Sequence, residues 1–514
     1  MKAYWILAML ALLVLGGAAV WMGALNQDEG WYLYAANLVA EGKMPYRDFF
    51  YTQGPMLPVV YSAFTGIWKT FGLLGARVFT LALGLVGLAF AVALAARRAA
   101  PEAKGKVALM TALLLGANIY HLYYVTIPKT YALAALFVLV GFFTLSFADA
   151  PARGLKAVLW AAVAGASLAF AAGTRISLGA ILAVVGLSLL MRAVRGGGWG
   201  PLVGFCLGGF GVLALVYGPF LLDAEARGGL LAAQAYHAAR GGFDPVWTVG
   251  SFSRLVRWYL PVFIVLGLGV ARLVLRTARV RPFEWTLLAA FCAVFAVQML
   301  APFPYEDYQV PVMGLLAVFA VVSMTAVPPA EAPRAAGVGR LAPLLVLGLS
   351  FATSFGSPLL EQWSTNGQDR FWSYKKASYE LAQLRDVARR IETLDPGGKD
   401  LLTQDLYLAI ETNRRVPVGF EMGPFSFWGD AAPAGSERRP VMTDATLRAL
   451  LGRAPCAVAA LSGYSFAITA PRCDETPVAR QMDYWSLLKR NYALAFKEES
   501  FGQNATTLLV LKRK

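Results

Sequence analysis

The chain has 514 residues, of which 58% are hydrophobic and 15% are charged, and its formal net charge is +15. Soluble domains carry about 25% charged residues, so this composition indicates a polytopic membrane protein. Nucleic-acid binding is excluded as a reading of the positive charge, because lysine and arginine lie in short clusters between apolar runs and form no basic stripe with interleaved aromatics. Such clusters are typical of the positive-inside rule.

The first apolar run covers residues 3–25 and follows Lys2. It is longer than the apolar region of a signal peptide, which is about 7–15 residues, so we expect an uncleaved first span that enters from the cytoplasm. The next segment, 26–76, is then an outer loop. It begins with adjacent carboxylates, Asp28 and Glu29, followed by an aromatic helix over 31–41. Ionisable groups beside a membrane span are costly to hold there and are usually functional. The alternative is a structural role, in which the two carboxylates cap the helix and complement its dipole in the first turn.

Residues 56–71 form an apolar run that is interrupted by Pro58, Gly66 and Lys69. Counted as a full span, it would move the basic cluster at 97–106 to the outside, against the positive-inside rule. The sequence therefore predicts an interfacial or re-entrant helix on the outer face.

Ten further runs approach the length of about 20 apolar residues that a span needs. They cover residues 77–96, 107–124, 130–148, 155–172, 176–191, 202–222, 258–275, 283–301, 308–327 and 341–358. With these spans every basic cluster falls on the cytoplasmic side, which favours a total of about eleven. The outer loop 223–254 is expected to hold a short helix over 230–240.

The composition becomes mixed and polar after residue 358. We therefore expect a polytopic α-helical membrane domain over 1–358 and a soluble C-terminal α/β domain over 359–514. Apolar residues at helical spacing predict a helix over 379–394, and strands are predicted over 401–407, 457–461 and 506–511. An odd number of spans places this domain outside.

Four cysteines divide by their surroundings. Cys206 and Cys292 lie inside apolar runs and are expected to be inert. Cys456 and Cys473 lie in the outer C-terminal region, where a disulfide can form; two unrelated thiols are the alternative.

The first outer loop and the start of the span that follows it contain a pattern of acidic, aromatic, glycine and proline residues. The full set is Asp28, Glu29, Tyr32, Ala35, Ala36, Glu41, Gly42, Pro45, Tyr46, Arg47, Asp48, Gly54, Pro55, Phe71, Gly72, Ala76 and Arg77. This loop resembles that of GT-C glycosyltransferases, and in particular of glycosyltransferase family 39. That family includes protein O-mannosyltransferases, and related enzymes transfer aminoarabinose to lipid A. The resemblance covers residues 1–200, with a weaker match near 308.

The resemblance implies a GT-C fold and an enzyme that takes a sugar from a polyprenyl-phosphate donor at the outer leaflet. The sugar would pass to an acceptor hydroxyl on a lipid, glycan or protein. Asp28 and Glu29 would be the catalytic carboxylates, with Asp28 as general base or acceptor-orienting group. The same resemblance implies that Tyr32, Asp48 and Gln53 contact donor or acceptor.

The leaving polyprenyl phosphate needs cationic stabilisation. Arg175, Lys129 and Arg47 are the expected phosphate ligands, and Arg175 stands at a helix start, where the helix dipole also favours an anion. The alternative for Arg175 and Lys129 is a cation that extends to the membrane interface. The sequence departs from some relatives in both the first outer loop and the start of the span at 130–148: Gln53 stands where they carry a lysine, and Lys129 where they carry an acid.

Glu306 and Asp307 precede the span at 308–327, where relatives often show histidine or arginine. We expect this pair to face the same cavity as Asp28 and to bind the acceptor; a solvated turn that caps the span is the alternative.

The sequence predicts no cofactor and no metal site. His121 and His237 are the two histidines, and neither has partners at a metal-ligand spacing. There is no phosphate-cradling Gly-x-x-x-x-Gly-Lys motif, so the sugar is expected to arrive already linked to its lipid.

We expect a multi-pass protein of a bacterial inner membrane, with the active site and C-terminal domain facing the periplasm or exterior. A flippase of lipid-linked sugars and a cell-wall polymerase of the same fold are the rival functions.

Overall fold

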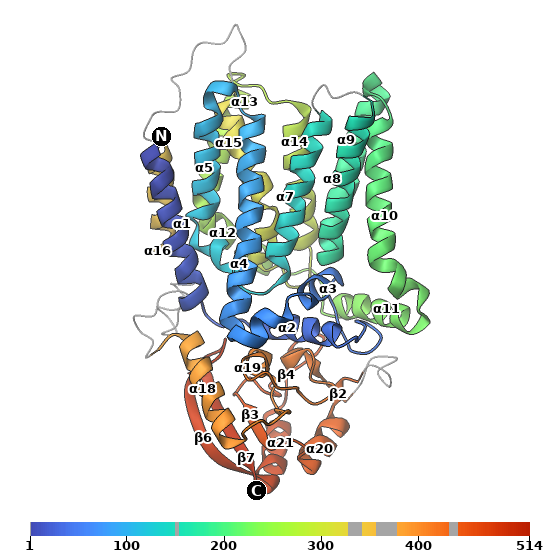
Figure 1. Cartoon of the computed structure of the whole chain (residues 1–514), viewed down its shortest axis with the longest axis vertical. Coiled ribbons are helices and arrows are strands. Elements are labelled where there is room, and N and C mark those ends of the chain that lie inside the picture. The colour runs from blue at the N-terminus through green and yellow to red at the C-terminus, as the bar shows by residue number, and fades with distance from the viewer. Residues whose placement is uncertain (1, 150–153, 327–341, 356–377, 431–439) are drawn as a thin grey trace.

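The structure is a computed structural model that describes residues 2–149, 154–326, 342–355, 378–430 and 440–514. A bundle of upright helices stands above a layer of shorter helices that lie across its lower end, and a mixed C-terminal unit lies below this layer (Figure 1). The expected boundary between residues 358 and 359 lies outside the described residues.

Every apolar run expected to span the membrane contains a helix. The bundle helices are α1 (Lys2–Met22), α4 (Thr65–Arg98), α5 (Lys104–Gly116), α7 (Thr130–Asp149), α8 (Leu155–Thr174), α9 (Gly179–Arg192), α10 (Gly200–Leu222), α13 (Leu260–Val274), α14 (Pro282–Met299), α15 (Val310–Thr325) and α16 (Ala342–Phe355). Short 3-10 or π turns adjoin them at η1 (Pro101–Ala103), η2 (Ile176–Leu178), η3 (Ala193–Gly197) and η4 (Glu306–Gln309). The predicted class, a polytopic helical membrane protein with a small-sheet C-terminal unit, is confirmed.

Fewer helices than eleven are long enough to cross a membrane alone. Within the described residues, 8 helices meet the length and apolarity of a span, or up to 9 when α12 (Pro245–Trp258) and α13, bent by 87°, count as one. The run 107–124 is interrupted, because Asn118 accepts a hydrogen bond from the backbone N–H of His121 and caps a new helix, α6 (Ile119–Tyr124). A single helix over 107–124 was therefore a wrong prediction.

The interfacial helix predicted over 56–71 is divided into two pieces. The first is α3 (Met56–Ser62), and the second is the beginning of α4. Gly72 interrupts α4 with φ 65° and ψ −157°, a conformation that glycine adopts without steric cost. The predicted piece therefore joins the following span through a kink, and it forms no separate span.

The layer below the bundle contains α2 (Gln27–Ala40), α3 and α11 (Ala224–Ala238) (Figure 1). Asn26 caps α2: its Oδ1 accepts from the backbone N–H of Asp28 at 3.0 Å, and Glu29 Oε1 accepts from the backbone N–H of Asn26 at 3.0 Å. The cap is therefore Asn26 and not Asp28, so the carboxylate of Asp28 takes no part in capping. Helix α11 begins six residues earlier than its predicted start at 230.

Glu29 points away from Asp28 into a fully buried ion pair. Its two carboxylate oxygens accept from Nε and Nη2 of Arg77 at 2.7 and 2.6 Å, and neither side chain is exposed. Arg77 also donates to the last carbonyls of the α1 segment, those of Val20, Gly23 and Ala24. This pair joins α1, α2 and α4 at the lower end of the bundle.

The C-terminal unit combines helices with small sheets. Its elements are α18 (Glu380–Leu394), α19 (Leu406–Glu411), η5 (Gly423–Ser426), β1 (Phe427–Gly429), β2 (Met442–Thr443), α20 (Asp444–Arg453), β3 (Val458–Leu461), β4 (Ile468–Thr469), β5 (Asp474–Glu475), α21 (Val478–Asn491), β6 (Tyr492–Phe501) and β7 (Thr506–Arg513). The largest sheet has the order β3-β7-β6, with antiparallel pairs. The predicted helix 379–394 and strands 457–461 and 506–511 are present.

The strand predicted over 401–407 was wrong. Only single bridges form at Asp400 and Leu402, and α19 begins at Leu406. Asp405 precedes α19 and is buried, with one carboxylate oxygen accepting from Tyr407 Oη at 2.7 Å. Local hydrogen bonding by an aspartate favours a turn and a helix start over a continuous strand.

The C-terminal unit docks on α2 with very little space between the two backbones. Gln27 Nε2 donates to Asp405 Oδ1 at 3.0 Å, and the backbone N–H of Val416 donates to Tyr34 Oη at 3.0 Å. At Gly30, a Cβ atom would lie 2.3 Å from the backbone nitrogen of Tyr407. Glycine at this position permits the close approach, so α2 and the C-terminal unit pack as one body here.

We expect Gly30→Ala to loosen this docking. The added methyl group meets backbone and not a flexible side chain, and overpacking of this kind costs about 1–3 kcal/mol. Limited proteolysis should cleave the variant faster within 378–514, and its thermal midpoint in detergent should fall. Gly66→Ala is the matched control, because a Cβ at Gly66 meets nothing within 4 Å. Equal proteolysis of the two variants would contradict the prediction.

The predicted disulfide between Cys456 and Cys473 is not formed, and both thiols are free. Cys456 is buried beside β3, where burial raises the pKa of its thiol to about 12. Cys473 lies at the start of β5 and faces the cavity described below. Their spacing in the sequence was compatible with a disulfide, but the turn that contains β4 and β5 directs the two side chains to different places.

Candidate functional site

A cavity of about 1170 Å³ lies where the bundle, the helices below it and the C-terminal unit meet. Aromatic rings and polar groups line it together. Its charged lining residues are Asp28, Lys129, Arg175, Arg240, Arg254, Glu306 and Asp307. They come from the helices α2 and α12, from η4, and from the turns before α7, after α8 and after α11, so the fold brings distant segments to one site.

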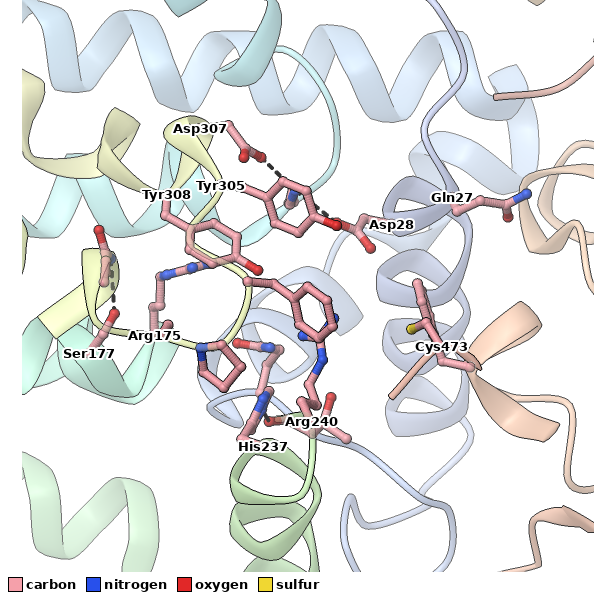
Figure 2. A pocket seen from close by; sticks show the side chains of 18 of the residues that line it. Gln27, Asp28, Arg175, Ser177, His237, Arg240, Tyr305, Asp307, Tyr308 and Cys473 are labelled. Atoms are coloured by element: carbon pink, nitrogen blue, oxygen red, sulfur yellow. Dashed lines mark hydrogen bonds and ion pairs between the residues drawn. The ribbon is translucent and has the colours of Figure 1, made fainter. Parts of the chain in front are cut away.

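Asp28 stands in the first turn of α2, with its carboxylate at the cavity (Figure 2). Trp31 Nε1 donates to its Oδ1 at 3.0 Å, and Lys129 Nζ lies 2.8 Å from its Oδ2. Burial alone would raise the pKa of Asp28, but the charge and hydrogen bond of Lys129 outweigh it, and the pKa lies below its usual value. Asp28 is therefore ionised at neutral pH and keeps 23% of its side chain exposed.

Lys129 also contacts the second carboxylate, that of Asp307, at 2.9 Å. Lys129 immediately precedes α7, and Asp307 lies in η4. Tyr131 Oη donates to the same Asp307 oxygen at 2.8 Å. Asp28 and Asp307 thus lie on the same side of the cavity (Figure 2), with the lysine ammonium between them.

Arg175 follows α8 and is 9% exposed. Its guanidinium lies over the ring of Tyr308, 4.3 Å from the centroid, and Tyr308 stands beside it in Figure 2. Nη1 reaches Thr130 Oγ1 at 3.5 Å, and Nε has no hydrogen-bond partner. Within the described ranges no carboxylate forms an ion pair with Arg175, so a buried positive charge faces the cavity without an ion-pair partner.

Two further arginines line the cavity. The guanidinium of Arg240 lies 4.5 Å from the centroid of Phe303, and Arg254 Nε lies 3.2 Å from Glu306 Oε2. Burial raises the pKa of the Cys473 thiol, and a hydrogen bond with Arg240 counteracts this effect. Arg254 is thus neutralised by Glu306, whereas Arg240 stacks on an aromatic ring and contacts a thiol.

The structure places three of the predicted site residues away from the cavity lining. Glu29 is held by Arg77. Arg47 pairs with Asp48 at 3.0 Å and with Asp223 at 3.6 Å. Asp48 also accepts from the backbone N–H of Met44 at 2.7 Å, so it stabilises the turn of its own loop. Tyr32, Gln53, Glu306 and Asp307 do line the cavity.

Several lining residues were missed from the sequence. These are Trp31, Tyr236, His237, Arg240, Trp247, Arg254 and, from the C-terminal unit, Met422, Phe425, Tyr464, Cys473 and Gln503. The residues after 400 reach the cavity only because the C-terminal unit docks on α2, and no local sequence pattern signals that docking. In the part of the chain that the structure describes, no group of three or more His, Cys, Asp or Glu is placed to hold a metal ion.

Comparison with known proteins identifies the fold through solved structures. No family model matches the chain, and no curated protein matches it. Among solved structures, ArnT from Cupriavidus metallidurans bound to undecaprenyl phosphate is similar with a TM-score of 0.62 and 15% identity, over 99% of this chain and 98% of that chain. The chain has a GT-C fold. The apo state of the same ArnT gives a TM-score of 0.61 at 15% identity, with the same two coverages of 99% and 98%.

A second solved protein is also similar to the chain, with lower identity. The oligosaccharyltransferase AglB from Archaeoglobus fulgidus, in complex with an inhibitory peptide and a dolichol-phosphate, is similar with a TM-score of 0.50 and 11% identity, over 90% of this chain and 70% of that chain. The GT-C fold predicted from the first outer loop is therefore confirmed, and it extends through the C-terminal unit.

Proposed function

We propose that the chain is a membrane glycosyltransferase that moves a sugar from a polyprenyl-phosphate donor to an acceptor hydroxyl. One observation carries this proposal: an ionised carboxylate, Asp28, and a cation whose Nε has no hydrogen-bond partner, Arg175, line the same cavity. Transfer of a sugar from a phosphate needs both charges, a base for the acceptor and a cation for the leaving group. The ArnT of similar fold binds undecaprenyl phosphate.

In the proposed reaction Asp28 accepts the proton of the acceptor hydroxyl. The acceptor oxygen then forms a bond to the anomeric carbon of the sugar, and the bond from that carbon to the phosphate oxygen breaks. The electron pair of the broken bond stays on the polyprenyl phosphate. A positioned general base contributes typically about 10²–10⁴-fold to such a step.

Arg175 is the residue that we assign to the phosphate of the donor. A guanidinium presents several donors in one plane and binds phosphate oxygens in pairs. The Nε of Arg175 has no hydrogen-bond partner, so a phosphate would satisfy a donor that is otherwise buried without one. Lys129 already contacts two carboxylates, so its positive charge is balanced and is less available to bind a phosphate.

We further propose that the cavity and the C-terminal unit face the periplasm or cell exterior of a bacterial inner membrane. Helix α4 begins beside the C-terminal unit, where Glu411 accepts from the backbone N–H of Leu73 at 2.7 Å, and it ends at Arg97 and Arg98. A basic helix end opposite the C-terminal unit agrees with the positive-inside rule.

The decisive experiment supplies the purified protein in lipid nanodiscs with a labelled polyprenyl-phosphate sugar and a mixture of membrane and envelope acceptors. A glycosyltransferase releases polyprenyl phosphate and labels an acceptor. A flippase leaves the donor intact, so an undiminished donor over the whole time course would contradict the proposal. Repeated additions to one acceptor would instead identify a polymerase of the same fold.

Arg175→Met should reduce transfer by roughly 10²-fold, the typical loss when one donor to a developing anion is removed. Methionine replaces the apolar stem of the arginine but not the guanidinium that lies over the ring of Tyr308, so the fold of the variant is checked by its thermal midpoint in detergent. The measurement is initial rate against donor concentration, together with binding of polyprenyl phosphate. Arg47→Met is the matched control, since Arg47 pairs with Asp48 and Asp223 outside the cavity lining. Equal rates for the two variants would remove Arg175 from the proposed site.

A further inference from the structure

The ammonium of Lys129 lies between two carboxylates and is almost completely buried. Nζ is 2.8 Å from Asp28 Oδ2 and 2.9 Å from Asp307 Oδ2, and 8% of the side chain is exposed. The ring of Tyr131 covers it with a centroid distance of 4.7 Å. An ammonium has three donors, and two of them are taken by these carboxylates.

Without this cation the carboxylates of Asp28 and Asp307 would line the same cavity with no cation between them. Two carboxylates that contact the same ammonium lie close together, and neighbouring like charges disfavour double ionisation, so one carboxylate would take up a proton. Lys129 keeps its own proton, since burial lowers the pKa of its ammonium but the charges of Asp28 and Asp307 raise it further, well above its usual value. The arrangement thus contains one fixed positive charge between two negative charges.

The same contacts connect three segments that are distant in sequence. Asp28 belongs to α2, Asp307 to η4 at the beginning of the α15 segment, and Lys129 to the turn before α7. Tyr131 donates to Asp307, which fixes the second carboxylate from the α7 side as well. The position of the Asp28 carboxylate is therefore set by Lys129 as well as by its own helix.

We propose that Lys129 is a positioning residue, an internal cation that bridges Asp28 and Asp307, keeps Asp28 ionised, and takes the place that a bridging divalent cation would have between facing carboxylates. This inference rests on the proposed function, in which Asp28 is the base. It assigns Lys129 to the carboxylates and not to the donor phosphate.

Lys129→Met removes the charge and keeps an unbranched apolar side chain that is one atom shorter. We expect kcat to fall about 10²-fold, the loss that a misplaced catalytic group can cause. We also expect the acid limb of the pH–rate profile to move to higher pH. Lys129 lowers the pKa of Asp28, and without it burial and Asp307 raise that pKa. The other groups that face Asp28 stay in place in this variant: Trp31, Tyr32, Tyr236, Arg240 and Tyr464.

Binding of undecaprenyl phosphate distinguishes the two roles of Lys129. In the positioning role, Lys129→Met binds this lipid phosphate as the wild type does, and only kcat and the pH profile change. Weakened lipid binding with an unchanged acid limb would overturn the proposal and assign Lys129 to the phosphate. Lys69→Met, at an exposed lysine of α4, controls for loss of a positive charge and should leave all three readouts unchanged.

Asp307→Asn tests the bridge from its other end, and it serves where Lys129→Met is not recovered as folded protein. It removes a negative charge near Asp28 but keeps Lys129, so the acid limb should move to lower pH, opposite to the Lys129→Met shift. An acid limb that stays in place or moves to higher pH would overturn the bridge.

Wild-type transfer should also persist in EDTA. Loss of transfer in EDTA with recovery on added Mg²⁺ would overturn the role of Lys129 as the bridging cation. If the wild type transfers no sugar at all, the proposed function fails and not this inference alone.

Discussion

Asp28→Asn is expected to reduce sugar transfer by about 10²–10⁴-fold, the contribution of a general base. Asparagine has nearly the same shape, and its carbonyl oxygen can still accept from Trp31 Nε1, which donates to Asp28 at 3.0 Å. The amide accepts no proton from the acceptor hydroxyl. Because Asn26 caps α2, the helix start does not depend on residue 28. The variant should therefore fold and bind donor while turnover is lost.

The wild-type pH profile should show the same carboxylate. Lys129 holds the pKa of Asp28 below its usual value, so the ionised base persists into mildly acidic solution. Activity should be retained above that lowered pKa and lost as the pH falls through it. The measurement is kcat against pH with a labelled donor.

Glu41→Gln is the matched control for Asp28→Asn. Glu41 ends the same helix and pairs with Arg415 at 3.4 Å on the protein surface, where 36% of the Glu41 side chain is exposed. Surface pairs of this kind contribute about 0–1 kcal/mol, so this variant should keep normal turnover. Near-normal turnover by Asp28→Asn would show that the acceptor is activated by another group, and the proposed mechanism would be wrong.

The bundle was predictable because span length and basic clusters follow from the membrane itself. Apolar runs of span length have few alternatives to a helix, since every backbone polar group must be satisfied within the segment. The breaks were less predictable. Asn118 interrupts the 107–124 run by capping α6, and Gly72 kinks α4 where two helices meet; each depends on one residue whose local conformation outweighs its apolar neighbours.

The site was partly predictable for a different reason. Asp28, Lys129, Arg175 and Asp307 are ionisable residues at the ends of apolar runs, where charge is costly unless it is used or paired. Glu29 carries the same signal but points elsewhere. Successive residues of a helix are about 100° apart around its axis, so adjacent carboxylates at its start face different surroundings. Spacing alone does not say which of the two faces the cavity.

The contribution of the C-terminal unit was not predictable from local patterns. Tyr464 and Cys473 line the cavity because α19 docks on α2 and the β4–β5 turn extends beneath it. That docking depends on Gly30, which reads in the sequence as an unremarkable helix residue. Cys473 faces the cavity whereas Cys456 is buried beside β3, so the predicted disulfide does not form.

Arg77→Met is expected to destabilise the protein by about 3–5 kcal/mol, the typical cost of leaving one partner of a buried ion pair uncompensated. Glu29 would remain at 0% exposure without its guanidinium, and the carbonyls of Val20 and Gly23 would lose the donor that Arg77 supplies, whereas the carbonyl of Ala24 would still accept from Tyr123 Oη. The measurement is the free energy of unfolding, or the thermal midpoint, of the protein in detergent. Arg389→Met is the control, because Arg389 is 78% exposed and its pair with Asp386 contributes little.

The Glu29→Gln variant separates structure from chemistry at the acidic pair. It leaves Arg77 buried with a neutral partner, so we expect a loss of stability close to that of Arg77→Met. The double variant Arg77→Met/Glu29→Gln should be more stable than the sum of the two single changes implies, since it removes both charges. Turnover per folded molecule should stay near normal in Glu29→Gln, because this carboxylate is held by Arg77 and does not line the cavity. Stable but inactive Glu29→Gln protein would return Glu29 to the catalytic machinery, and the buried pair with Arg77 would then have to open during the reaction.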